Sequence, residues 1–158
     1  MRNARLFIAA ISLVACSKSE SAKPDSTPAM AATPAAPAAV TAADMAGTVN
    51  GKIMSQNSDS VLATFTCTAP ATGNVTRCVN SAAPKDTTNY AYTLSGADSV
   101  MFTSDPYTPP APPKSPKLID HVVGRLSGNK WTGTTVSVLA SKPDSVVSRV
   151  RWEATKAQ

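Results

Sequence analysis

Apolar and polar residues alternate with a period of two along most of the chain after residue 46. Near the C-terminus, Val150, Trp152 and Ala154 fall on one face of an extended chain. Arg151 and Glu153, which lie between them, fall on the other face. Because successive side chains of a strand point to opposite faces, this pattern predicts half-buried strands. We predict eight strands, of which the third has the weakest pattern: 47–54, 60–69, 74–79, 88–95, 99–104, 119–126, 131–140 and 145–155.

Clusters of turn residues separate the predicted strands, for example Ser-Gly-Ala-Asp at 95–98 and Ser-Gly-Asn-Lys at 127–130. No segment shows helical periodicity over three turns. The pattern therefore predicts an all-β domain, an antiparallel up-and-down meander of about eight strands that closes into a small barrel. An open sheet or a sandwich is the alternative. If apolar side chains fill the interior of so small a barrel, little room is left for a ligand.

Near the N-terminus, Arg2 and Arg5 precede a ten-residue apolar run, Leu6–Ala15. That run is much shorter than the roughly 20 residues that a membrane-spanning helix needs, so it is typical of a signal peptide. Cys16 follows directly, and Leu13-Val14-Ala15-Cys16 resembles the lipobox of bacterial lipoproteins. An ordinary signal peptide, with Cys16 as an incidental thiol, is the alternative.

The resemblance to lipoproteins implies cleavage between Ala15 and Cys16 and attachment of acyl chains, such as palmitate, to Cys16. Two or three acyl chains would anchor the protein stably to a membrane of the bacterial cell envelope. Serine stands at position 17, where lipoproteins kept in the inner membrane often have aspartate. We therefore expect the outer membrane rather than the inner one.

Residues 16–46 are rich in Ala, Pro, Ser and Thr, and Met30, Val40 and Met45 are their only large apolar residues. Such a segment buries too little surface to offset the entropy of ordering it, so it is predicted to be a disordered linker. The predicted organisation is a signal peptide at 1–15, the lipidated cysteine with its linker at 16–46, and the β-domain at 47–156.

Cysteine content agrees with export from the cell. Apart from Cys16 the chain has one pair, Cys67 and Cys78, which we expect to form a disulfide in an oxidising compartment. With a single histidine and no second cysteine pair, no metal site is expected, and no cofactor is predicted. The formal net charge of +5 is scattered along the chain and forms no basic stripe, so nucleic acid is not an expected partner.

Residues 105–117 contain six prolines and form the longest predicted connection. Prolines prevent strand pairing and favour a stiff, extended segment. Within it, Tyr107, Lys114 and Lys117 offer a possible contact surface for a partner. The alternative is a rigid crossover without a binding role.

Catalytic groups are scarce. His121 is the only histidine, and its neighbour Asp120 would point to the opposite face of the same strand, so Asp120 cannot orient the imidazole. No glycine-rich phosphate loop and no Gly-x-Ser-x-Gly motif is present. The sequence therefore predicts a protein that is not an enzyme.

These features predict a membrane-anchored envelope lipoprotein whose small non-catalytic β-domain binds a protein or a glycan. One alternative is a carrier or sensor of a small apolar ligand inside the barrel, which resembles the calycin architecture in layout only. Another is a small inhibitor of an enzyme. A cavity of a few hundred Å³ within the barrel would favour the carrier.

Overall fold

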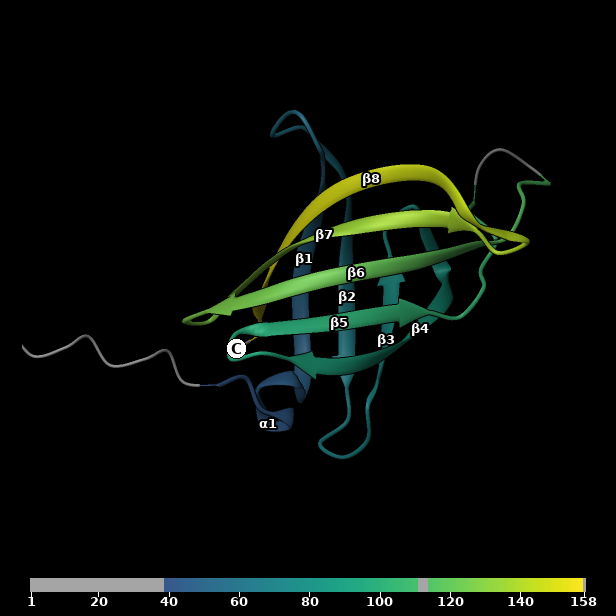
Figure 1. Ribbon diagram of the computed structural model, residues 1–158. Coiled ribbons are helices and arrows are strands. Elements are labelled where there is room, and N and C mark those ends of the chain that lie inside the picture. The colour runs from purple at the N-terminus through teal and green to yellow at the C-terminus, as the bar shows by residue number, and fades with distance from the viewer. Residues whose placement is uncertain (1–38, 111–113, 158) are drawn as a thin grey trace, which may run out of the picture. The chain divides into compact units, whose positions relative to one another are not determined.

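The computed structural model describes residues 39–110 and 114–157. Ala15, Cys16 and the rest of the predicted signal peptide and linker up to residue 38 lie outside the described residues. Eight antiparallel strands follow one another around a closed barrel (Figure 1). They are β1 (Gly47–Ser55), β2 (Val61–Ala69), β3 (Val75–Asn80), β4 (Ala83–Ser95), β5 (Ser99–Ser104), β6 (Leu118–Ser127), β7 (Lys130–Leu139) and β8 (Lys142–Lys156). The predicted all-β meander and its closure into a barrel are confirmed.

The two ends of the barrel differ in what covers them. At one end, which we term the helix end, lie the short helix α1 (Ala42–Met45) and the connections at 70–74, 96–98 and 128–129. At the other, which we term the loop end, lie the connections at 56–60, 81–82, 105–117 and 140–141. Figure 1 shows α1 below β1 at the lower left and the β5–β6 connection leaving the end of β5 at the right. Among the described residues, no helix has the length and apolar character needed to cross a membrane.

The folded region begins before Gly47, in a part of the chain that was predicted to belong to the linker. Val40 and Met45 are buried in the same cluster as Val100 and Trp131 at the helix end. The backbone N–H of Val40 donates to the carbonyl of Ala97 over 2.6 Å, which ties this segment to the β4–β5 turn. Two of the few large apolar residues in the predicted linker therefore close the helix end of the barrel.

Two strands begin earlier than predicted, and each begins beside a proline. β4 includes Pro84, and β8 includes Pro143. The pairing register shifts next to both prolines, so that Asn80 pairs with Ala83 whereas Val79 pairs with Thr87. Because the shift leaves the proline outside the regular ladder, its missing N–H interrupts no hydrogen bond there.

Inside the barrel, a pair of glycines accommodates the largest side chain. Gly124 and Gly133 face each other across β6 and β7. The ring of Trp152 lies over both, and a Cβ atom added at Gly133 would be 2.6 Å from the Trp152 Cζ2 atom. Since that separation is shorter than a van der Waals contact, the absence of side chains here lets the ring lie close against the barrel wall. Space is thereby kept free in the interior.

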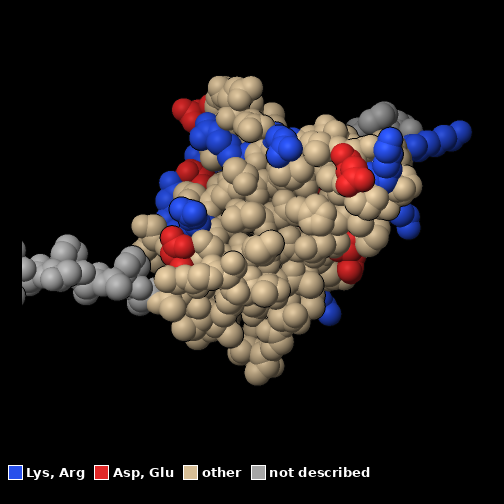
Figure 2. All heavy atoms as spheres, viewed as in Figure 1, with Lys and Arg blue, Asp and Glu red and all other residues tan. Residues whose placement is uncertain are grey.

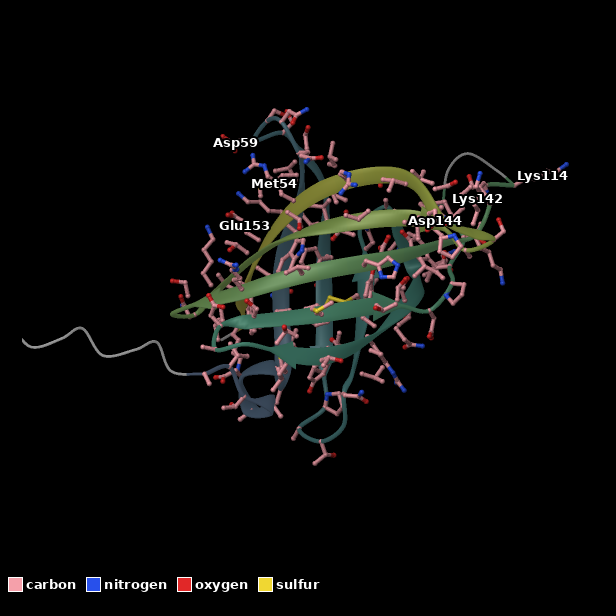
Figure 3. All side chains as sticks on the ribbon, in the orientation of Figure 1. Met54, Asp59, Lys114, Lys142, Asp144 and Glu153 are labelled. Atoms are coloured by element: carbon pink, nitrogen blue, oxygen red, sulfur yellow. A yellow bond between two sulfur atoms is a disulfide. The ribbon has the colours of Figure 1, made fainter. Side chains whose placement is uncertain are left out.

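On the outer surface, charged side chains join the first and last strands. Lys52 Nζ and Lys130 Nζ lie 2.8 and 2.6 Å from the two carboxylate oxygens of Glu153. Arg151 reaches from β8 to the β1–β2 turn, where it forms an ion pair with Asp59. Figure 3 labels Glu153 and Asp59 along this side of the barrel. These contacts support the β1–β8 pairing that completes the barrel.

Candidate binding cavity

The interior of the barrel holds a cavity of about 570 Å³, lined by side chains from all eight strands. Residues of the helix end, such as Met45, and of the loop end, such as Thr108 and Pro110, also contribute to its wall. Cavities of roughly 300 to 1,000 Å³ are typical of small-molecule sites in proteins. Apolar side chains therefore do not fill the interior of this barrel, and the space that they leave is large enough for a small ligand.

The greater part of the cavity wall is apolar and aromatic. Phe65 and Trp152 meet edge to face, with ring centroids 6.2 Å apart, and Phe102, Val122 and Trp131 continue this surface. Apolar surface of this kind binds apolar ligand groups by removing both from water.

The disulfide also belongs to the cavity wall. Cys67 and Cys78 are directly opposite each other in β2 and β3, and their Cα atoms are 4.0 Å apart. The bond confirms the predicted pairing and fixes β3, whose strand pattern was the weakest in the sequence. Both cysteines line the cavity, so the disulfide holds this side of the wall in place.

One buried carboxylate, Asp120, interrupts the apolar wall towards the loop end. It lies on β6 between Leu118 and Val122, and only 6% of its surface is exposed. Two hydroxyls donate to its Oδ1 atom, that of Ser137 over 2.6 Å and that of Tyr107 over 3.0 Å.

The second carboxylate oxygen and the backbone of Asp120 also have partners. The Tyr90 hydroxyl donates to Oδ2 over 3.0 Å, and the Tyr107 hydroxyl lies 3.1 Å from the same atom. The Asp120 backbone N–H donates to the Ser104 hydroxyl oxygen over 2.9 Å. The carboxylate therefore sits in a fixed position at the cavity wall, among side chains from β4, β5, β7 and the β5–β6 connection.

The two tyrosines remain neutral donors over the physiological pH range. Burial, followed by the negative charge of Asp120, raises the pKa of both Tyr90 and Tyr107 well above the ordinary tyrosine value of 10.0. Because both hydroxyls keep their protons, both continue to donate to the carboxylate.

The proline-rich connection is fixed at its first residues by this same cluster. Tyr107 pairs with Leu118 through two backbone hydrogen bonds of 3.0 and 2.8 Å and turns its hydroxyl inward to Asp120. The Lys114 and Lys117 side chains are exposed, and Figure 3 shows Lys114 pointing away from the barrel. The three residues that were predicted to form one contact surface therefore lie apart. Tyr107 lies in the cavity wall, and the two lysines lie outside it.

Asp120 is the residue that sequence reasoning missed. Its neighbour His121 is exposed on the outer surface, so the prediction that the two side chains point to opposite faces is confirmed. The same alternation places Asp120 on the apolar face of β6 with Leu118 and Val122. A charged residue on an otherwise apolar strand face is a sign of a buried polar site, and it was available from the sequence.

Trp152 provides a second unusual polar group in the cavity wall. Its ring nitrogen Nε1 is buried and has no hydrogen-bond partner among residues 39–110 and 114–157. An indole N–H is a donor only, so an acceptor on a bound molecule would satisfy it.

No group of three or more His, Cys, Asp or Glu side chains placed to hold a metal ion occurs in the described part of the chain. Comparisons with protein-family models, with curated proteins and with solved structures give no match to this chain. The site is therefore interpreted from its own geometry.

Proposed function

We propose that this protein is a lipid-anchored protein of the bacterial envelope whose barrel binds a small, largely apolar ligand. The single observation that supports ligand binding most strongly is the cavity of about 570 Å³ with its aromatic lining. The envelope location and the anchor at Cys16 rest on the N-terminal sequence, with Ala15 as the last residue removed. The outer membrane is the proposed destination.

A binding role suits the groups in the cavity better than a catalytic one. The His121 side chain lies on the outer surface, away from the cavity. Within the cavity, the Asp120 oxygens already accept hydrogen bonds from three hydroxyls, which hold the carboxylate in one position. We therefore propose a carrier or sensor and no enzymatic activity.

Tryptophan fluorescence offers a direct test, because both tryptophans of the chain line the cavity. Titration of the full chain with apolar probes, such as decanol, is expected to change the emission saturably. A Val122→Phe substitution narrows the cavity and is expected to weaken this binding. The matched control is Val123→Phe, since Val123 is 44% exposed and its side chain alternates to the outer face. Equal binding by both variants would contradict a ligand site in the barrel.

A protein or glycan partner on the outer surface is the second candidate. Met101 and Val123 are paired across β5 and β6, and they are 53% and 44% exposed. Figure 2 shows charged side chains towards the borders of the visible face and uncharged residues over its centre. A photo-crosslinking residue at position 101, compared with one at Lys142 on the loop end, tests this surface in intact cells. Equal labelling from both positions would argue against it.

A further inference from the structure

We infer that the cavity selects ligands with a positively charged amino group, which binds against Asp120, while the apolar part of the ligand lies on the aromatic wall. This inference rests on the proposed binding function and adds the chemical class of the ligand. Three observations support it: the charge of the cavity wall, the hydrogen bonding of Asp120, and the order of polar and apolar groups along the cavity.

The charge of the cavity wall is opposite in sign to that of the chain. The chain has a formal net charge of +5, with 15 Lys and Arg residues against 10 Asp and Glu. Among the cavity-lining residues that the structure describes, however, Asp86 and Asp120 are the only charged side chains, and both are acidic. The cavity therefore favours cations, whereas the protein as a whole repels them.

Asp120 has no cationic partner among the described residues. The ion pairs of the described chain involve Glu153 and Asp59, both on the outer surface. The three groups that donate to Asp120 are neutral hydroxyls, so they stabilise the carboxylate without cancelling its charge. A buried charge without a partner of opposite sign is costly, and a cationic ligand would neutralise it.

Hydrogen bonding leaves room for a donor from the ligand. An ionised carboxylate offers about four lone-pair sites. Three protons are available to them, because the single Tyr107 proton is shared between Oδ1 and Oδ2. An ammonium group would supply the missing donor in a charge-assisted hydrogen bond. A ligand carboxylate would meet repulsion from Asp120 at the same place.

The neighbouring residues determine the rest of the ligand. Val122 follows Asp120 on the same face of β6, and Phe102 and Trp131 extend the apolar wall from there. Asp86 is exposed on β4 towards the loop end, so a cation entering from that side meets a second carboxylate. The expected ligand is an amine with one apolar body, and its ammonium group is also attracted to the faces of aromatic rings.

Three probes with the same ten-carbon chain test this inference: decylamine, decanol and decanoic acid. Each is titrated into the full chain at neutral pH, with tryptophan fluorescence and calorimetry as readouts. The amine is expected to bind at least tenfold more tightly than the alcohol, and the acid more weakly than the alcohol. The positive net charge of the protein works against nonspecific uptake of the amine, so a preference for it reports on the cavity.

An isosteric substitution assigns the preference to one residue. Asp120→Asn is expected to bring the affinities for the amine and the alcohol within about twofold of each other, mainly by weakening the binding of the amine. Asp144→Asn is the matched control, because Asp144 is exposed at the loop end and lies outside the cavity wall. This variant is expected to keep the full preference for the amine.

The outcomes separate the two proposals. Equal binding of amine and alcohol by the unmodified chain would overturn the inference and leave ligand binding in the barrel intact. If none of the three probes binds, the proposed function itself fails. If Asp120→Asn does not fold, the measurement on the unmodified chain still tests the inference. Equal affinities for the amine and the alcohol in that chain would overturn it without a variant. A preference that survives in folded Asp120→Asn would also overturn it.

Discussion

The helix end and the loop end of the barrel are built from the same strands but differ in their packing. At the helix end, Val40 and Met45 are buried against Val100 and Trp131, and Val100 has no exposed surface. At the loop end, Asp120 and the hydroxyls of Tyr90, Tyr107 and Ser137 form a polar cluster beside the cavity. The comparison indicates that the main apolar cluster lies at the helix end, whereas the loop end carries the polar cluster against which we propose that a ligand binds.

Among the substitutions that test this difference between the two ends, Trp131→Ala at the helix end is expected to cause the largest loss of stability. Trp131 is 4% exposed and belongs to the buried cluster, so its truncation should lower the free energy of unfolding by about 3 to 5 kcal/mol. Urea denaturation followed by circular dichroism measures this loss. Trp131→Phe, which keeps an aromatic ring, is the control and should lose clearly less. A loss below 1 kcal/mol for Trp131→Ala would show that the helix end is not the main core.

Truncation of the buried side chain of α1 should cause the next largest loss of stability. Met45→Ala deletes the buried side chain by which α1 closes the barrel, and we expect a loss of about 2 kcal/mol. Met101→Ala is the matched control, because Met101 is 53% exposed and should lose less than about 0.5 kcal/mol. Both values come from the same denaturation experiment. Equal losses would mean that α1 does not contribute to the core.

At the loop end, Tyr107→Phe removes one donor from Asp120. We expect a loss of only about 1 kcal/mol, but faster trypsin cleavage after Lys114, because the hydroxyl fixes the proline-rich connection to the barrel. Tyr92→Phe is the matched control, since the Tyr92 hydroxyl donates to the Gly73 carbonyl at the helix end over 2.9 Å. Its loss should leave cleavage after Lys114 unchanged. Equal cleavage rates in both variants would contradict the role of Tyr107.

The smallest change in stability is expected from substitution of Glu153 on the outer surface. Hydrogen bonds from Lys130 and Lys52 lower the pKa of this carboxyl from 4.5 to about 2. Since the folded pKa is depressed, the contribution to stability is present above about pH 4.5 and is lost as the pH falls towards 2. Glu153→Gln should remove this part of the acid dependence, measured as melting temperature against pH. An unchanged acid profile would mean that the two lysines do not stabilise the carboxylate.

Much of the fold was predictable because the signal for each strand is local. Alternation identifies a strand from five or six consecutive residues, and the turn clusters place its ends. The early starts of β4 and β8 were not predictable in this way, since Pro84 and Pro143 argue locally against a strand. They are tolerated because the register shifts beside them, and a register depends on the partner strand.

The candidate site was less predictable because its parts are distant in sequence. Asp120, Tyr90 and Ser137 meet only after β4, β6 and β7 have paired in the correct register around the barrel. The cavity likewise depends on the position of the Trp152 ring, which the glycines at 124 and 133 determine from two other strands. A periodicity within one segment contains no information about such contacts.

The pairing of β1 with β8 has a consequence for the way the chain is made. Val49 lies opposite Lys156, so the barrel cannot close until nearly the whole chain is available. Contacts between residues so far apart form late in folding and slow it. If the protein is exported, as the N-terminal segment predicts, this delay would help the chain to stay unfolded during translocation. The barrel would then close after the chain has crossed the membrane.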